Sequence, residues 1–184
     1  MDEITFFSDV SLDIETLGTQ PGAMITQIGV ALFNRTGSPE THTASWNLAL
    51  EPQQALGFTV EVATLQWWLR QSAEARDSWA NAPTTLPSDA LRELSTLIQH
   101  RCIKPTLWAN SPSFDFVMLA PFWRRAKIEQ PWKFYMEADV RTLKLVAPAV
   151  PKRTPALAHN AASDAEAQAL YVRDVFAHLN KSGA

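Results

Sequence analysis

The sequence predicts an α/β fold in which a mixed sheet is flanked by helices. Its first third alternates apolar and polar residues with the period of two that half-buried strands show, and short turns separate these segments. The rest repeats apolar residues at helical spacing around one short apolar run that is typical of a buried strand. Strands followed by helices interleaved with strands indicate one mixed α/β domain over residues 1–184.

The first three strands are predicted to form an antiparallel meander. Apolar and polar residues alternate strictly over 10–16, and the segments 24–33 and 41–50 are predicted as the second and third strands. Turn-forming residues at 17–22 and 34–39 separate them. Strands joined by connections this short pair with their neighbours in antiparallel fashion.

The later elements follow from helical periodicity and from capping residues. They are predicted, in chain order, as a helix over 59–69, a helix over 88–101, a buried strand over 105–110, and helices over 114–125, 139–146 and 163–179. Ser88 and Asp139 stand where N-caps are expected, and Ser163 with Glu166 has the spacing of a capping box. The proline-containing segment 147–158 is predicted as a mobile loop.

Composition and charge exclude several classes of protein. With 46% hydrophobic and 19% charged residues, the chain is neither a disordered tail nor a coiled coil. A net charge of −3 argues against a protein that coats long duplexes, because that mode of binding depends on an excess of Lys and Arg. An enzyme that grips a few nucleotides at a strand end remains compatible with this charge, particularly if bound cations offset its carboxylates.

The sequence also predicts where the protein resides. Cys102 is the single cysteine, so it cannot form an internal disulfide and is expected to be a buried thiol in a reducing compartment. Residues 1–4 are acidic and lack the pattern of a signal peptide, and no segment has the apolar length needed to cross a bilayer. We therefore expect a cytoplasmic protein that does not enter a membrane.

Two acids in the first strand are the first candidate site. Asp13 and Glu15 leave the same face of the strand, about 6.6 Å apart, close enough for their carboxylates to converge. Two converging carboxylates need a cation or a proton. The alternative is an acidic pair on a solvent-facing edge strand that guards against aggregation.

Two further acids and one histidine stand at helix starts. Asp115 opens a helix directly after a buried strand, which is where α/β folds place ligands, and Asp164 lies in the first turn of the last helix. Either acid alone could simply favour the helix dipole. His159 precedes Asp164 in the loop that feeds the helix, so its ring can hang over whatever Asp164 binds. The remaining histidines are expected to be solvated side chains, namely His42, His100 and His178.

Together these residues resemble the DEDDh exonucleases, a family with a ribonuclease H-like fold. The motifs that carry the resemblance are, in chain order, Asp13-x-Glu15, Asp115 preceded by Phe114 and Asn110, and His159-x-x-x-x-Asp164. The segments 64–68, 139–143 and 159–168 are most similar to small bacterial and phage 3′–5′ exoribonucleases. The resemblance covers nearly the whole chain and implies a ribonuclease H-like sheet, with the three-strand meander continued by parallel strands.

The resemblance implies a role for each acid and for the histidine. Two Mg²⁺ or Mn²⁺ ions would be held by four carboxylates, those of Asp13, Glu15, Asp115 and Asp164. Hard cations of this kind prefer carboxylate oxygens, which matches a set of acids without a cysteine ligand. His159 would act as general base on the attacking water, a task that suits a side chain with an ordinary pKa of about 6.5.

The resemblance also implies how substrate is bound. Thr16 and Leu17 would meet the terminal nucleotide, with Leu17 wedged against its base, while Phe114 packs nearby and Asn110 contributes to binding. Stacking of this kind tolerates any base. The loop with Lys152 and Arg153 would contact phosphates and bring the general base into place when substrate binds.

The expected activity is removal of nucleoside 5′-monophosphates from the 3′ ends of single-stranded RNA or DNA, with RNA favoured. Rival expectations are a catalytically silent nucleic-acid-binding or assembly protein of the same fold, and a metal-dependent phosphatase acting on small nucleotides. An endonuclease of the same broad fold fits the histidine motif less well. Relatives of this kind often pair, so the resemblance also leaves room for a homodimer.

Overall fold

A computed structural model describes residues 5–182. The expectation of no signal peptide rests on residues 1–4, which lie outside this range. In chain order the elements are β1 Phe7–Thr16, β2 Ile25–Phe33, β3 Thr41–Asn47, α1 Leu50–Ala55, α2 Val62–Trp68, α3 Ala73–Ala80, α4 Pro87–Arg101, β4 Cys102–Ala109, α5 Pro112–Ala126, the 3₁₀ helix η1 Phe134–Met136, β5 Glu137–Asp139, α6 Val140–Val146 and α7 Ala161–Ser182.

The sheet is mixed, as the sequence predicts. Its strand order is β3-β2-β1-β4-β5. The first three strands form the expected antiparallel meander, and β4 and β5 continue the sheet in parallel with β1. The predicted α/β ribonuclease H-like arrangement is therefore confirmed. It places β1 between two hydrogen-bonded neighbours, so the acidic pair on β1 does not guard an exposed edge.

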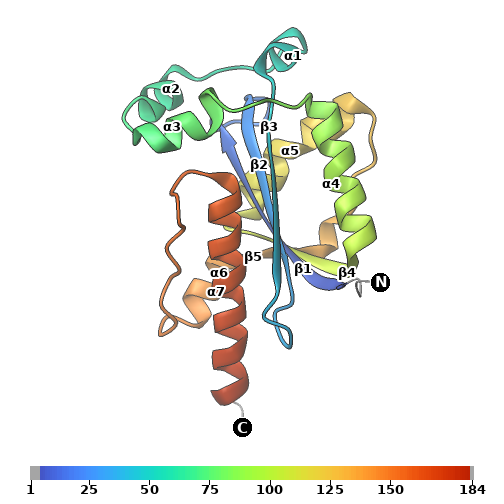
Figure 1. Cartoon of the computed structure of the whole chain (residues 1–184), viewed down its shortest axis with the longest axis vertical. Helices are drawn as coiled ribbons and strands as arrows, with labels where there is room; N and C mark the ends of the chain where they lie inside the picture. The colour runs from blue at the N-terminus through green and yellow to red at the C-terminus, as the bar shows by residue number, and fades with distance from the viewer. Residues whose placement is uncertain (1–4, 183–184) are drawn as a thin grey trace.

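Helices cover the sheet on both faces (Figure 1). α7 packs against β1 and β2 on one face, while α4 and α5 pack on the other. α1, α2 and α3 lie between β3 and α4 in the chain and sit over one end of the sheet. Every residue of β2 is buried, because a strand covered on both faces has no solvent side. For the same reason, the polar residues Asp9 and Ser11 of β1 are fully buried.

Several predicted boundaries are wrong for local physical reasons. The third strand ends at Asn47, and Leu50 opens the unpredicted α1. α4 starts at Pro87 and not at Ser88, because proline fits the first helical position, where no amide donor is needed. No side-chain cap precedes α4. α3 and the three-residue β5 were not predicted, since both are short and neither shows a clear apolar period.

The predicted capping box at the last helix is also wrong. α7 begins at Ala161, and the amide of Ser163 donates to Oδ1 of Asn160 at 3.2 Å. The Ser163 hydroxyl instead accepts from the amide of Leu157 at 2.9 Å, which ties the preceding loop to the helix. Asp139 is confirmed as the cap of α6, accepting from the amide of Arg141 at 2.9 Å.

Other expectations hold within the described part of the chain. Cys102 is a buried free thiol, and burial raises its pKa to about 12, so it stays protonated. The segment between α6 and α7 contains neither helix nor strand. Among residues 5–182, no helix combines the length and the apolar character that crossing a membrane requires.

Candidate active site

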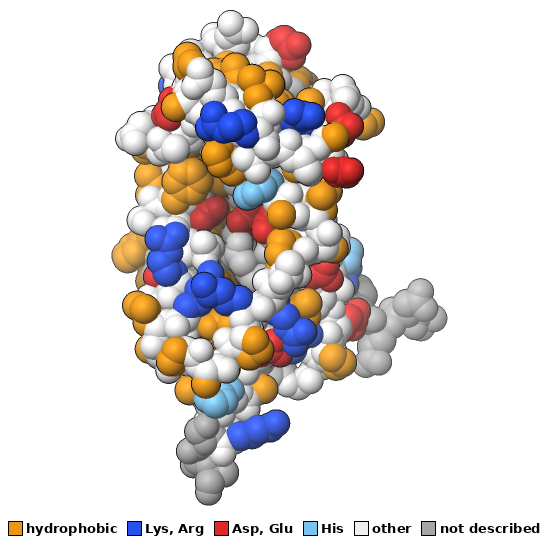
Figure 2. All heavy atoms as spheres, turned by 90° about the vertical axis from the view of Figure 1, so that its left-hand side faces the viewer, with side chains coloured by type: hydrophobic (Ala, Val, Ile, Leu, Met, Phe, Trp, Pro, Cys, Tyr) orange, Lys and Arg blue, Asp and Glu red, His pale blue; other side chains and the backbone are white. Residues whose placement is uncertain are grey.

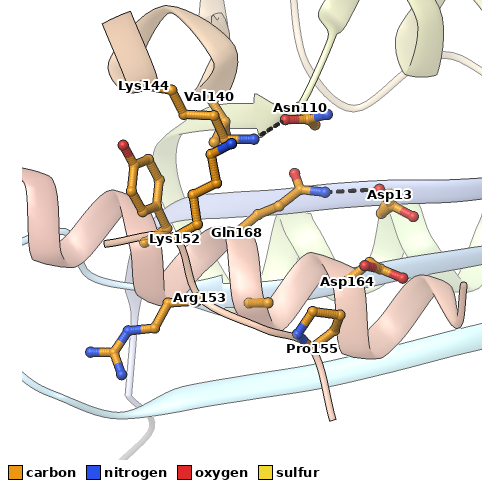
Figure 3. Close-up of a pocket in the computed structure, with 11 residues that line it drawn as sticks. Asp13, Asn110, Val140, Lys144, Lys152, Arg153, Pro155, Asp164 and Gln168 are labelled. Carbon is orange, nitrogen blue, oxygen red and sulfur yellow. Dashed lines mark hydrogen bonds between the residues drawn. The ribbon is translucent and has the colours of Figure 1, made fainter. Parts of the chain in front are cut away.

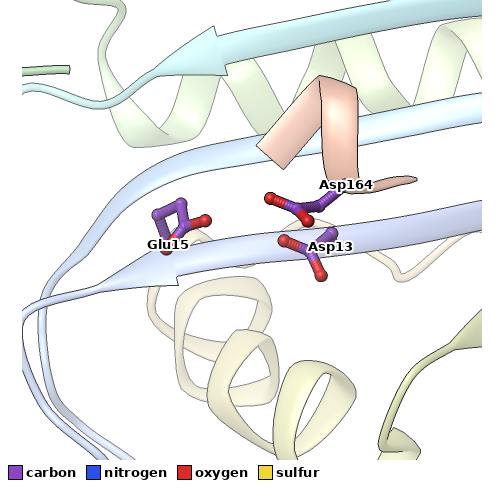
Figure 4. A group of neighbouring side chains, drawn as sticks. All are labelled: Asp13, Glu15 and Asp164. Carbon is purple, nitrogen blue, oxygen red and sulfur yellow. The ribbon is translucent and has the colours of Figure 1, made fainter. Parts of the chain in front are cut away.

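Three carboxylates meet where β1 passes beneath the start of α7. Asp13 and Glu15 lie on β1, and Asp164 lies in the first turn of α7. One carboxylate oxygen from each residue lies within 4.8 Å of those of the other two. Figure 4 shows the three side chains turned toward a common space. The prediction that Asp13 and Glu15 converge is thereby confirmed, and α7 supplies the third acid.

The start of α7 lies directly on β2, which is why Asp164 reaches β1. Gly29, which pairs with Asp13 in the sheet, faces the backbone of Ala161 so closely that a Cβ atom at Gly29 would lie 2.1 Å from the Ala161 carbonyl carbon. The amide of Ala161 also donates to Oε1 of Gln27 at 3.3 Å. A residue without a side chain and a buried amide side chain therefore fix the position of the helix start.

Asp115 lines the same cavity but stands apart from the closest three acids. It lies in the first turn of α5, is 4% exposed, and accepts hydrogen bonds from backbone amides that include that of Ile14. A cavity of about 470 Å³ is lined by all five predicted catalytic residues, namely Asp13, Glu15, Asp115, His159 and Asp164. Figure 2 shows acidic side chains in a hollow on this face, with a histidine beside them.

Burial beside other carboxylates raises the pKa of every acid in the cavity. Burial, followed by the charges of Asp164 and Asp115, raises the pKa of Glu15 to about 8. Burial raises the pKa of Asp115 to about 7 and also raises that of Asp164. Burial and the neighbouring carboxylates raise the pKa of Asp13 well above its ordinary value. A divalent cation would relieve this repulsion, and a set of carboxylate oxygens suits Mg²⁺ or Mn²⁺.

His159 is held over the carboxylates by backbone and by aromatic contacts. Its φ of 61° places it in the left-handed region, where the chain turns into α7. Its ring packs edge-on against Trp67 with 4.8 Å between ring centroids. Its positive charge, when present, favours the ionised form of Asp164, whose Oδ2 accepts from the amide of Asn160 at 3.2 Å. The ring thus reaches the cavity of the acids.

The predicted substrate residues are only partly brought together. Thr16 and Phe114 line a cavity of about 460 Å³ next to the carboxylates. Leu17 does not line it, because its side chain is 4% exposed and belongs to the core. Asn110 lies on the other side of the carboxylates, where its Oδ1 accepts from Nζ of Lys144 at 2.5 Å. The structure therefore gives no support to the predicted base wedge at Leu17.

Two residues of the site were not assigned their roles by sequence reasoning. Gln168 donates from Nε2 to Oδ1 of Asp13 at 2.8 Å and so orients that carboxylate. It lies one helical turn after Asp164, a spacing that could have pointed to it. Trp67 is the wall behind His159, whereas Trp68 is buried and donates to the carbonyl of Thr16 at 2.8 Å.

Comparisons with known proteins identify a family and a related fold for this chain. The family described as the Rv2179c-like 3′–5′ exoribonuclease domain matches residues 8–176. A zinc-bound complex of E. coli exonuclease I with single-stranded DNA is similar with a TM-score of 0.66 and 13% identity, covering 96% of this chain and 42% of that chain. E. coli exonuclease I bound to a deoxyadenosine oligonucleotide gives a TM-score of 0.59 and 14% identity, covering 94% of this chain and 42% of that one.

The likeness to exonuclease I concerns the fold alone, and this chain spans less than half of those chains. A comparison with curated proteins finds no match. The family match, in contrast, extends over most of the sequence and includes every acid of the cavity. The chain therefore belongs to the family of Rv2179c-like 3′–5′ exoribonuclease domains.

Proposed function

We propose that the chain is a divalent-metal-dependent exonuclease that releases nucleoside 5′-monophosphates from the 3′ ends of single-stranded nucleic acid, RNA ahead of DNA. The observation that carries the proposal is the convergence of Asp13, Glu15 and Asp164 within 4.8 Å in one cavity with Asp115 and His159. This set combines cation ligands with a titratable ring, which is what hydrolysis of a phosphodiester requires.

The four carboxylates would hold two Mg²⁺ or Mn²⁺ ions, which supply charge neutralisation and Lewis-acid activation when bound. The chain's own contribution is placement. β1 fixes Asp13 and Glu15 on one face, the contact of α7 with Gly29 fixes Asp164, and the hydrogen bond from Gln168 orients Asp13. Such preorganisation is what lets a site act without rearranging during the reaction.

His159 would accept the proton of the attacking water. Its ring lines the cavity of the carboxylates and is supported on its far side by Trp67. A general base works best with a pKa near the operating pH, which suits imidazole. Backbone geometry and an aromatic wall together keep this ring at the mouth of the site.

The terminal nucleoside would occupy the 460 Å³ cavity beside Glu15. Trp67 and Phe114 give this cavity aromatic walls, and Thr16 lies at its edge. Bases of any identity stack on aromatic side chains, and each stacked base contributes about 1–3 kcal/mol to binding.

We further propose that residues 1–184 act as one exonuclease domain in the cytoplasm. We also propose that the protein can pair as a homodimer, which analytical ultracentrifugation would measure.

His159→Ala is expected to lower the rate of hydrolysis by about 10²- to 10⁴-fold, the usual contribution of a general base. His100→Ala, an exposed histidine on α4, is the matched control and should retain the rate. An unchanged rate in His159→Ala would assign the base to another group.

The activity itself is tested with one oligonucleotide sequence, as RNA and as DNA, labelled at the 5′ end and incubated with Mg²⁺ or Mn²⁺. We expect a ladder that shortens one nucleotide at a time and that disappears with EDTA. Intact substrate with folded protein would favour a silent binding protein, and internal cuts an endonuclease. Release of phosphate from nucleoside phosphates, with no dependence on chain length, would favour a phosphatase.

A further inference from the structure

A second cavity of about 200 Å³ opens beside the carboxylates, and we call it the basic cavity. The 470 Å³ cavity that the acids line is called the carboxylate cavity, and the 460 Å³ cavity lined by Trp67 and Phe114 is called the aromatic cavity. The basic cavity lies on the side of the carboxylates opposite the aromatic cavity. It shares Asp13, Asn110 and Asp164 with the carboxylate cavity. The aromatic cavity shares Ile14, Glu15 and Phe114 with the carboxylate cavity. The basic and aromatic cavities have no lining residue in common. If the terminal nucleoside lies in the aromatic cavity, the bond to be cut lies at the carboxylates. The part of the strand 5′ of that bond would then reach the basic cavity.

Two lysines from separate segments converge in this second cavity. Lys144 comes from α6 and Lys152 from the following loop, and Figure 3 shows their side chains extending to the same place. Burial lowers the pKa of Lys144, and the charge of Lys152 lowers it further. Among residues 5–182 neither ammonium group forms an ion pair with a carboxylate. Two cations brought together in this way are suited to an anion.

Other contacts position Lys144 and distinguish Lys152 from the adjacent Arg153. The hydrogen bond to Asn110 keeps Nζ of Lys144 at the cavity. Arg153 is already paired, donating to both carboxylate oxygens of Asp174 at 2.6 and 2.9 Å, and its guanidinium points away from the cavity in Figure 3. Of the two basic residues in the loop, Lys152 is therefore the one available to a ligand.

The size and charge of the cavity define its ligand. About 200 Å³ lies below the roughly 300–1,000 Å³ of sites that enclose a drug-sized molecule, so it suits a phosphate group better than a nucleoside. Lysine binds phosphate as a point charge. We propose that Lys144 and Lys152 bind the phosphate of the substrate strand that lies one linkage 5′ of the bond being cut. This proposal rests on the proposed function, because it takes the nucleic-acid strand as the ligand.

The test measures binding separately from hydrolysis. A 5′-fluorescein RNA trinucleotide is titrated into protein carrying Asp13→Asn, and anisotropy is compared with a second probe whose linkage 5′ of the terminal one is a neutral methylphosphonate. We expect Lys144→Gln with Lys152→Gln to weaken binding of the first probe at least tenfold. In that variant the difference between the two probes should disappear, because the proposed partner of the charge is gone.

Salt dependence gives an independent reading. Losing one phosphate contact should reduce the slope of log affinity against log salt by about 0.7 for a single strand. Arg153→Gln, which removes a neighbouring cation already bound to Asp174, is the control and should weaken binding less than twofold. If Arg153→Gln weakens binding as much as the double variant does, the loss of affinity reflects the overall positive charge of the loop, and the proposal fails.

Failure of the subsite can be distinguished from failure of the exonuclease. A lysine variant that still tells the two probes apart overturns the subsite and leaves hydrolysis untouched. Lysine-dependent binding without hydrolysis by the unaltered protein would support the subsite and overturn the exonuclease. An equal loss of affinity for both probes would show that the lysines only neutralise the carboxylates, and would overturn the proposed phosphate contact.

Discussion

Asp13→Asn is expected to abolish hydrolysis of labelled RNA and, at the same time, to raise the melting temperature of the metal-free protein at pH 8. The variant removes one of four carboxylates that are crowded into a single cavity. The asparagine side chain has nearly the same shape, and its Oδ1 can still accept from Gln168. Activity is lost because a ligand is lost, whereas stability rises because like charges no longer face each other when no cation is present.

The pH dependence of stability follows from the same charges. The pKa of Glu15 is about 8 in the folded protein against an ordinary 4.5, so the folded state holds this proton more tightly than the unfolded state. Its contribution to stability is complete below about pH 4.5 and is lost as the pH rises to about 8. Each unit of pKa shift corresponds to about 1.4 kcal/mol, so the loss is on the order of a few kcal/mol.

Thermal unfolding measured from pH 5 to pH 9 checks this prediction. We expect the metal-free protein to melt at progressively lower temperature with rising pH, and Asp13→Asn to flatten the curve. About 1 kcal/mol shifts the melting temperature of a domain this size by about 2–4 °C, so the difference at pH 8 should be several degrees. Mg²⁺ or Mn²⁺ should stabilise the unaltered protein more at pH 8 than at pH 5.

The matched control is Glu166→Gln, an exposed acid on the same helix as Asp164. It removes one negative charge near the site without touching the cavity, so both activity and the pH dependence of melting should be retained. A lower melting temperature for Asp13→Asn than for the unaltered protein at pH 8 would show that the carboxylates do not repel each other as their positions indicate.

Gly29→Ala is expected to eliminate activity through a single methyl group. A Cβ atom at this position would lie 2.1 Å from the carbonyl carbon of Ala161 and 2.3 Å from the amide nitrogen of Ala162. These are backbone atoms at the start of α7, so the helix must move away from β2. Asp164 lies in the first turn of that helix, and His159 lies two residues before the helix begins. Displacing the helix therefore separates both residues from Asp13 and Glu15.

The loss of stability and the loss of activity can be separated by a control at another glycine. Gly37→Ala places a side chain at φ of +86° in the β2–β3 turn, where a Cβ atom meets nothing within 4 Å. It should cost on the order of 1 kcal/mol through backbone strain and leave activity intact. Exonuclease assays below both melting temperatures then report geometry alone. Full activity of Gly29→Ala would mean that the helix start tolerates displacement.

Features that depend on a local sequence pattern could be predicted from the sequence, whereas features that depend on tertiary contacts could not. Asp13 and Glu15 were predictable because alternation along one strand decides which side chains share a face. Asp115 was predictable because a strand-to-helix junction has a local signature. The roles of Gln168, Trp67 and Lys144 depend on where α7, α2 and α6 dock, which no window of sequence contains.

The misplaced elements have equally local causes. Ser163 satisfies the spacing of a capping box, but the helix starts earlier, at Ala161, and Oδ1 of Asn160 accepts from the amide of Ser163. Leu17 was expected to meet substrate by resemblance, yet its apolar side chain finds a place in the core. A three-residue strand such as β5 is too short to display a period, and its pairing with β4 decides its conformation.

The hydrogen bond between Gln168 and Asp13 joins residues 155 positions apart in the chain. Contacts this distant in sequence carry the largest loop-closure entropy and tend to form late in folding. A molecule whose meander has formed but whose α7 has not docked has the two acids of β1 and lacks Asp164. Partly folded molecules are therefore expected to be unable to cut nucleic acid, so that catalysis itself reports completion of the fold.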